Sequence, residues 1–200
     1  MLPHECFYFG PYLARFNIDP AFSNRMLQVG KKLKESHAKQ LAGKIKNELL
    51  YDHTGKERWI TESYYPFIES YLQGYEKFAN VTLKHIKGIS LSSIWINFQK
   101  KNEMNPMHTH TGCNLSFVHW ISFPKAIIKE RNKDITTSAK PGGITFYYGE
   151  DQPFVITARE FLPKENTLMI FPSTFKHEVI GFKSNVCRIS VAGNIKVHHG

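Results

Sequence analysis

The sequence predicts a mainly β protein with helices in its N-terminal part, an α+β arrangement in which a β-sandwich or barrel carries helices on one face. In the N-terminal part, apolar residues recur at spacings of three and four, as in amphipathic helices. After about residue 88, short apolar-polar alternations follow at regular spacing, with Gly, Pro and Asn between them, as in antiparallel strands. We expect one domain over 1–200, with mainly helical support in 1–88 and a β core in 89–195.

The first fifty residues are predicted to be a lead-in followed by helix. Residues 1–20 are expected to be irregular or an edge strand, because their three prolines break any helix. Residues 21–51 are predicted to be helical, as one helix or as two, since Gly30 and Gly43 weaken the pattern. The apolar positions behind this prediction are Met26, Val29, Leu33, Leu41, Ile45, Leu49 and Leu50.

A second helix is predicted over about 62–80, after a turn at 52–56. Its broad apolar face is expected to pack on a sheet. The residues of this face are Phe67, Ile68, Tyr71, Leu72, Tyr75 and Phe78.

Strands are predicted where β-forming residues alternate or run together between turn residues. The expected strands are 93–99, 115–123, 143–148, 154–157, 167–171, 178–182 and 186–195. Residues 100–106 form a polar loop, and 125–142 are charged without a clear period. We expect 125–142 to be a long flexible loop, and such a loop in a compact domain often serves as a lid.

Composition excludes several classes of protein. Hydrophobic residues make up 42% and aromatic residues 14% of the chain, which excludes a disordered protein. No apolar run reaches the roughly 18 residues needed to span a bilayer, and the N-terminus has no signal-peptide pattern, so we expect no membrane partner. Cys6, Cys113 and Cys187 are an odd number without metal-type spacing, which favours free thiols and a cytoplasmic location.

The net charge of +9 raises the possibility of a nucleic-acid partner. The lysines, however, are spread along the chain, and no basic stripe alternates with aromatic residues. A solvated basic face is therefore favoured over a nucleic-acid site.

Three histidines form the candidate metal site. His108 and His110 are two residues apart beside a predicted strand, so their side chains can point to the same side. His177 precedes a later strand and offers a third imidazole. Imidazole suits iron, zinc, copper and nickel, and three protein ligands leave positions open for substrate. Cys113 lies nearby but is expected to be a small packing residue.

Arg188 and Ser190 form a candidate carboxylate clamp. They share one face of the strand 186–195, while Ile189 and Val191 share the other. A guanidinium group can bind a carboxylate through two parallel hydrogen bonds, and a hydroxyl adds one more donor. Alone, this arginine could be a solvent-facing charge, but its position eleven residues after His177 favours the clamp.

Together these motifs resemble the Fe(II)- and 2-oxoglutarate-dependent oxygenases, in particular the prolyl-hydroxylase-like branch with small bacterial and phage members. The resemblance covers roughly residues 90–195. The motifs that carry it are Asn105-Pro106-Met107-His108-Thr109-His110, Leu115-Ser116-Phe117-Val118, Gly142-Gly143-Ile144-Thr145-Phe146, Phe171-Pro172-Ser173 with His177-Glu178-Val179, and Arg188-Ile189-Ser190.

The resemblance implies a double-stranded β-helix, a jelly-roll or cupin-like barrel, and a dioxygenase, most simply a hydroxylase of peptidyl proline. It implies Fe(II) bound by His108, His110 and His177, with 2-oxoglutarate and O2 as cosubstrates. The far carboxylate of 2-oxoglutarate would bind Arg188 and Ser190. Asn97 shares a strand face with Trp95 and Gln99, and it either touches the cosubstrate or takes part in packing.

One position departs from the family pattern. The usual ligands are two histidines and one carboxylate, and His110 stands where Asp or Glu is expected. A neutral third ligand leaves the site one unit more positive, which alters the redox potential and the metal preference. Glu103 and Glu178 are alternative carboxylates, although Glu178 should point away from the side of its neighbour His177.

Three alternatives to this function stay open. A cupin-like enzyme could use the three histidines without 2-oxoglutarate, and a jelly roll could bind a sugar or another ligand without catalysis. The oxygenase could also use the positive charge to bind nucleic acid. The favoured substrate is a protein, a peptide or a small molecule.

Overall fold

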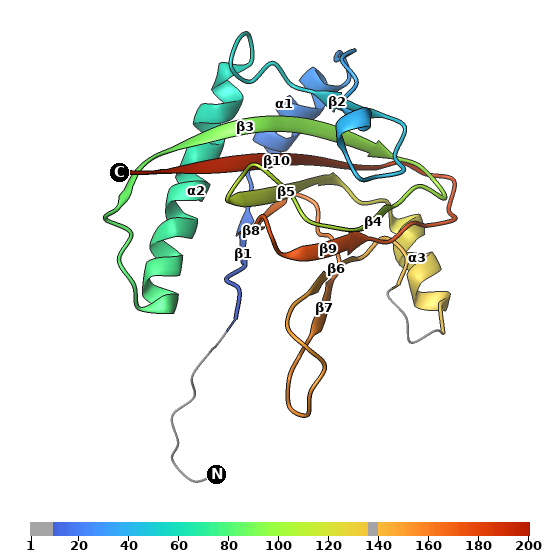
Figure 1. Ribbon diagram of the computed structural model, residues 1–200. Helices are drawn as coiled ribbons and strands as arrows, with labels where there is room; N and C mark the ends of the chain where they lie inside the picture. Colours follow the sequence, from blue (N-terminus) through green and yellow to red (C-terminus); the bar gives the residue numbers. More distant parts are fainter. Residues whose placement is uncertain (1–9, 136–139) are drawn as a thin grey trace.

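Two antiparallel sheets form the body of the molecule, and the computed structural model describes residues 10–135 and 140–200 (Figure 1). The larger sheet has the strand order β1-β8-β5-β10-β3-β2, and the smaller sheet has the order β4-β9-β6-β7. The strands of the large sheet are β1 (Ala14–Asn17), β2 (Glu48–Leu50), β3 (Ile86–Gln99), β5 (Leu115–Ser122), β8 (Thr167–Pro172) and β10 (Arg188–His199). Those of the small sheet are β4 (Asn105–His108), β6 (Ile144–Tyr147), β7 (Ala158–Phe161) and β9 (Lys176–Val179). The predicted mainly β architecture is confirmed.

Strand β10 lies inside the large sheet and sets the direction of the side chains that matter most. It pairs with β3 and β5, so that Ser190 lies opposite Asn97 on one side and Trp120 on the other. Val191 packs in the apolar core on one face of the sheet, while Arg188 and Ser190 line a cavity on the other face. The alternation predicted for this strand is therefore present.

The two sheets face each other across an apolar core. Its buried members from the large sheet are Trp120, Met169 and Phe171, and those from the small sheet are Ile144, Phe146 and Val179. Because both sheets contribute, residues on their facing sides can meet, which brings the small-sheet histidines near the large-sheet arginine.

Helices α1 (Pro20–Gly30) and α2 (Arg58–Ala79) pack against the outer face of the large sheet (Figure 1). Asp19 caps α1 by accepting a hydrogen bond from the backbone N–H of Ala21 at 2.8 Å, and α2 ends where Asn80 adopts a left-handed conformation. The buried residues of this helix-sheet core are Ile18, Met26, Tyr51, Ile60, Tyr64, Ile68, Tyr71, Leu91, Ile94, Ile96, Leu115, Phe117, Ile121, Leu168, Ile170, Val191 and Ile195. The second predicted helix is thus present and begins at Arg58.

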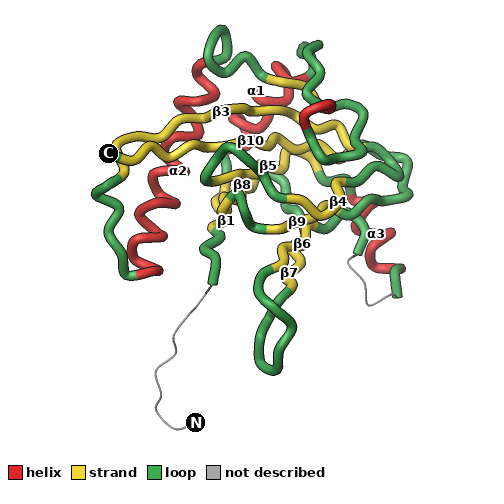
Figure 2. The backbone as a smooth tube through the Cα atoms, viewed as in Figure 1, coloured by secondary structure: helices red, strands yellow, loops and turns green. Residues whose placement is uncertain are grey.

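The helix predicted over 21–51 is correct only to Gly30. The following residues form loops, a single 3-10 turn η1 (Ala38–Gln40) and strand β2, as the tube in Figure 2 shows. Strand β2 pairs with β3, and this pairing overrides the helical spacing of the leucines. Gly30 also lies so close to the sheet that a Cβ atom there would come within 2.5 Å of Ile96 Cδ1.

The prediction of a flexible loop over 125–142 was wrong for its first half, which is helical. Helix α3 (Lys125–Lys133) begins directly after Pro124, and it buries Ile127 against Phe123 and Phe182. Arg131 adds a bidentate ion pair to Glu160, at 2.7 and 2.6 Å. Residues 136–139 lie outside the described part of the chain.

Smaller differences concern the ends of other predicted elements. The strand expected at 154–157 lies at β7 instead, and Phe154 is fully exposed with a positive φ of 66°. The edge strand expected within 1–20 is present as β1, whereas residues 1–9 lie outside the described part of the chain. Tyr12 docks on Tyr71, with ring centroids 5.0 Å apart.

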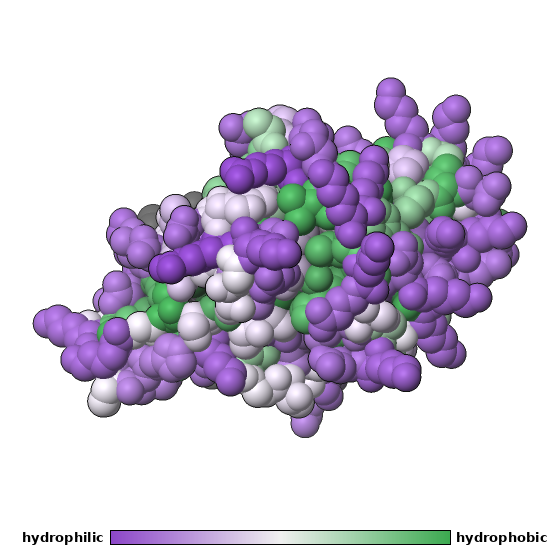
Figure 3. Space-filling view, turned by 90° about the horizontal axis from the view of Figure 1, so that it is seen from above, coloured by the Kyte–Doolittle hydropathy of each residue, from purple (hydrophilic) through white to green (hydrophobic). Residues whose placement is uncertain are grey.

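None of the described helices is long and apolar enough to cross a membrane. The face seen from above is mostly hydrophilic, with an apolar strip near its centre (Figure 3).

His119 is a buried polar group between the helices and the large sheet. Its Nε2 lies 2.9 Å from the hydroxyl of Ser23, its Nδ1 lies 2.9 Å from the hydroxyl of Tyr64, and Phe22 stacks on its ring. Burial lowers the pKa of His119 to about 4. The imidazole therefore stays neutral in the folded protein at pH values where an unfolded chain protonates it.

His119→Gln should make the stability of the protein less sensitive to acid. Between about pH 6.5 and pH 4 the unfolded wild type binds a proton that the folded wild type does not, so the free energy of unfolding falls as pH falls. His119 contributes about 1.4 kcal/mol per pH unit at most, or about 3 kcal/mol by pH 4. Urea unfolding of both proteins at pH 7.5, 6, 5 and 4, in the same buffers, measures the difference; equal slopes would contradict the prediction.

Candidate metal centre

The structure brings His108, His110 and His177 together at the inner side of the small sheet. His108 on β4 and His177 on β9 are cross-strand partners. His110 follows the end of β4, where its backbone N–H donates to the Ser173 carbonyl at 2.9 Å and keeps its chain beside the loop before β9. One possible ligand atom from each histidine lies within 4.8 Å of the others, and the Nε2 atoms of His110 and His177 are 3.4 Å apart.

Backbone carbonyls orient two of these imidazoles. Nδ1 of His108 lies 2.7 Å from the Pro106 carbonyl, and Nδ1 of His177 lies 2.8 Å from the Phe175 carbonyl. A carbonyl only accepts hydrogen bonds, so each Nδ1 carries the proton and each Nε2 keeps its lone pair. Such outer hydrogen bonds are the usual means of fixing a metal-ligating histidine.

All three imidazoles are held neutral. Burial lowers the pKa of His177 to about 3, with a further contribution from His108 and His110. Burial and the neighbouring His108 lower the pKa of His110 to about 4, although a hydrogen bond with Asn194 opposes this. The pKa of His108 is also lowered by burial. Three neutral imidazoles with converging nitrogen atoms fit a transition metal such as Fe(II).

The candidate clamp lies on the facing side of the large sheet. Arg188 and Ser190 line a small cavity of about 50 Å³ together with the three histidines and Asn97. The side chain of Asn97 donates to the hydroxyl of Ser190 at 3.4 Å. The six residues that the sequence singled out therefore surround one space.

Arg188 is buried without a carboxylate partner among residues 10–135 and 140–200. Its Nη1 donates to the Gly142 carbonyl at 3.0 Å, while its Nε has no acceptor in the described part of the chain. Burial lowers the pKa of Arg188 to about 10, which still leaves it protonated at neutral pH. A buried, incompletely satisfied guanidinium fits a bound carboxylate such as that of 2-oxoglutarate.

Neither alternative carboxylate joins the histidines. Glu103 accepts hydrogen bonds from the backbone N–H groups of Lys46 and Lys100, and Glu178 accepts one from the hydroxyl of Tyr147. In the described residues, the cluster of possible metal ligands contains histidine alone. Cys113 is a free thiol outside this cluster.

Glu48 belongs to none of the motifs that mark the site in the sequence. This residue lies on β2, where its Cα partner is Asn97, and it is fully buried. It lines a cavity of about 250 Å³ whose wall includes His108 and His110. Its sequence context does not mark it as a site residue, because Glu48 lies in a lysine-rich stretch whose apolar spacing predicts a helix.

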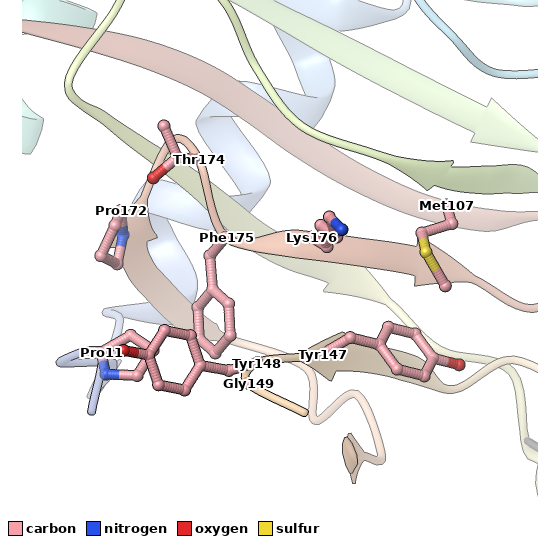
Figure 4. Close-up of a pocket in the computed structure, with 9 residues that line it drawn as sticks. All are labelled: Pro11, Met107, Tyr147, Tyr148, Gly149, Pro172, Thr174, Phe175 and Lys176. Carbon is pink, nitrogen blue, oxygen red and sulfur yellow. The ribbon is translucent and has the colours of Figure 1, made fainter. Parts of the chain in front are cut away.

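A larger hollow of about 320 Å³ lies on the other side of the small sheet (Figure 4). Met107 and Lys176 line it, and each immediately precedes a histidine of the cluster. Because successive strand residues point to opposite faces, this hollow does not contain the histidine side chains. Its apolar part comes from Phe175 and Tyr148, whose rings meet edge to face with centroids 6.3 Å apart.

A histidine cluster facing a buried arginine across two antiparallel sheets is the arrangement expected of a metal-dependent oxygenase. Residues 93–194, just over half of the chain, match the family model described as "Putative 2OG-Fe(II) oxygenase". The chain belongs to this family of Fe(II)- and 2-oxoglutarate-dependent oxygenases, which confirms the resemblance read from the sequence motifs.

Solved structures of the same fold agree with this assignment. An oxidoreductase of the 2OG-Fe(II) oxygenase family from Burkholderia pseudomallei is 13% identical, with a TM-score of 0.58 over 94% of this chain and 85% of that chain. The viral collagen prolyl hydroxylase of Paramecium Bursaria Chlorella virus-1 is 12% identical, with a TM-score of 0.58 over 93% and 96%. The epimerase SnoN from nogalamycin biosynthesis is 11% identical, with a TM-score of 0.58 over 92% and 78%. No curated protein matches the chain in sequence.

Proposed function

We propose that this oxygenase is a hydroxylase, in which His108, His110 and His177 bind Fe(II) and Arg188 binds 2-oxoglutarate. The observation that carries the proposal is the small cavity that the histidines share with the buried Arg188, which has no carboxylate partner in the described part of the chain. The two facing sheets would then form the double-stranded β-helix of the family. Epimerization by a protein of the same fold shows that fold alone does not select the reaction.

The side chains of this site have distinct roles in the proposed reaction. The Nε2 atoms of His108 and His177 would hold the metal, since their Nδ1 atoms are engaged by carbonyls, and His110 would supply the third nitrogen. Arg188 and Ser190 bind the far carboxylate of 2-oxoglutarate and so fix its orientation, and Asn97 supports the Ser190 hydroxyl. The apolar walls contributed by Trp120, Ile144 and Phe171 exclude water from this space.

When bound, iron and 2-oxoglutarate supply the oxidising chemistry: O2 is reduced, 2-oxoglutarate becomes succinate and CO2, and one oxygen atom enters a C–H bond of the substrate. Peptide-bound proline is a candidate substrate, because a viral enzyme named as a collagen prolyl hydroxylase shares the fold. A protein or small-molecule substrate is also compatible with the cavity of about 250 Å³ beside the histidines.

Anaerobic titration with Fe(II) and 2-oxoglutarate tests the proposal. We expect a visible charge-transfer band of the iron chelate, followed after addition of O2 by release of succinate. Proline-containing peptides are then tested for stimulation of succinate release and for a mass gain of one oxygen atom. If the wild-type protein neither binds nor turns over 2-oxoglutarate, the proposal fails.

One observation favours a second candidate function. The all-histidine cluster, among the described residues, resembles that of a cupin-like enzyme that works without 2-oxoglutarate. Arg188 would then bind a carboxylate of the substrate itself. This alternative predicts metal binding with no spectral response to 2-oxoglutarate, and the same titration separates the two functions.

A further inference from the structure

A buried carboxylate lies one strand away from the proposed cosubstrate site. Glu48 on β2 is paired with Asn97 on β3, so both side chains lie on the inner face of the large sheet. The residue has no exposed surface, and its backbone carbonyl accepts a hydrogen bond from the N–H of His37. The backbone of Glu48 is thus fixed by a strand and by a loop, which holds its side chain in one direction.

Neither carboxylate oxygen of Glu48 receives a hydrogen bond from any group in the described ranges 10–135 and 140–200. The amide oxygens of Asn97 and Asn105 are buried without a donor there as well. Glu103, by contrast, accepts two backbone N–H groups. The Glu48 carboxylate and these two amide oxygens thus receive no hydrogen bond from the described residues.

Keeping a carboxylate in such a place is costly, because burial without a partner disfavours its charged form. Burial, with a smaller contribution from Glu103, raises the pKa of Glu48 to about 7. Apolar or amide residues would fill the same space at lower cost. An incompletely satisfied buried acid beside a cavity is characteristic of binding and catalytic positions.

The cavity of about 250 Å³ connects Glu48 to the histidine cluster. Glu48, Asn105 and Trp95 contribute to its lining, and so do His108 and His110. The Trp95 ring is held in place by His37, with ring centroids 5.3 Å apart. Glu48 and the Trp95 ring thus lie at one part of the cavity wall, and the histidines lie at another.

We propose that Glu48 anchors the substrate of this oxygenase, and that the substrate places a protonated amine or a guanidinium group against it. This inference rests on the proposed function. A cation is the complement of a buried carboxylate that receives no hydrogen bond, and the face of an indole ring also attracts cations. The protein as a whole carries a net charge of +9, so long-range attraction does not favour a cation and the selectivity must come from Glu48 itself.

A matched pair of probes tests this assignment on the full chain loaded anaerobically with Fe(II) and 2-oxoglutarate. Nα-acetyl-L-arginine amide and Nα-acetyl-L-citrulline amide have nearly the same shape, but only the first is charged. A second pair, with lysine and norleucine, replaces the guanidinium with an ammonium. Calorimetry should show that the wild type binds one of the cationic probes at least about tenfold more tightly than its neutral counterpart.

Glu48→Gln should remove this preference while leaving the fold intact. The carboxamide has the same shape and carries no charge, so the variant should unfold at a temperature no lower than the wild type. Glu178→Gln is the control, because that carboxylate is bonded to Tyr147 and lies outside the cavity; it should keep the preference.

The possible outcomes separate this inference from the function on which it rests. If the wild type shows no charge-transfer band with Fe(II) and 2-oxoglutarate, the proposed function is refuted. A normal band with equal binding of the charged and neutral probes, or no binding of either, would overturn the role of Glu48 alone. An unchanged preference in Glu48→Gln would overturn it too, as would loss of the band in that variant. The wild-type comparison of probes decides the matter even where a variant fails to fold.

Discussion

Replacing His177 with alanine should lower the affinity for Fe(II) at least about 100-fold. Substitutions of residues that only support a metal ligand already cost 10–100-fold, so removal of a direct ligand should cost at least the upper end of that range. His177 is the most deeply buried histidine of the cluster, and its Nδ1 is tied to the Phe175 carbonyl, so Nε2 is the atom that it offers to the metal. Anaerobic Fe(II) titration against a competing chelator measures the loss.

The same titration of His110→Ala tests the unusual third ligand. In the proposed centre His110 stands where the family pattern has a carboxylate, and its Nε2 lies 3.4 Å from that of His177. We expect a loss comparable to that of His177→Ala. His119→Gln serves as the control, because His119 is buried on the other face of the large sheet against Ser23 and Tyr64. Wild-type affinity in the folded His110→Ala protein would show that iron is held by two histidines and by a group outside this cluster.

Two pairs of site residues could be predicted from the sequence, because the motifs that contain them are local and periodic. His108 and His110 are separated by one residue, and Arg188 and Ser190 alternate with apolar residues that must face a core. Each of these patterns sets the direction of a side chain without knowledge of the rest of the fold. The resemblance to a known family implied that His177 joins the other two histidines, but the pairing of β4 with β9 that brings it to His108 came only from the structure.

Glu48 could not be assigned to the site in the same way. The leucines that follow it fit a helical spacing, and only pairing with β3 reveals a strand. That pairing also sets the inward direction of the Glu48 side chain, so the error in secondary structure concealed the residue. The missed helix α3 has a related cause: nine mostly charged residues carry little periodicity, and the buried position of Ile127 depends on Phe123 and Phe182.

Replacing Arg188 with leucine should weaken the binding of 2-oxoglutarate by about 30-fold or more, while Fe(II) binding stays close to that of the wild type. Removing one partner of a buried, hydrogen-bonded charge pair costs roughly 2–5 kcal/mol, and each 1.4 kcal/mol is a factor of ten. Arg188 is the only described basic side chain among the residues that line the cavity shared with the histidines, apart from the histidines themselves. Titration of the charge-transfer band with 2-oxoglutarate gives the affinity.

Two further variants separate charge from geometry at this position. Arg188→Lys keeps the positive charge but loses the planar pair of donors, so its affinity should lie between those of the wild type and Arg188→Leu. Ser190→Ala removes one neutral hydrogen-bond donor, which is worth about 1 kcal/mol, and should weaken binding about fivefold. This order follows from a clamp whose main attraction is ionic and whose hydroxyl adds orientation.

The bond from Arg188 to the Gly142 carbonyl provides the competing structural explanation. If the arginine served only to hold the segment before β6, Arg188→Leu would lower the unfolding temperature and leave the affinity for 2-oxoglutarate unchanged in the folded fraction. If Arg188 is a clamp, Arg188→Leu should weaken 2-oxoglutarate binding and change the unfolding temperature little. Leucine removes the unpaired buried Nε together with the charge and so relieves part of the cost of burial. Measuring the unfolding temperature and the 2-oxoglutarate affinity on the same protein therefore decides between the two roles of this residue.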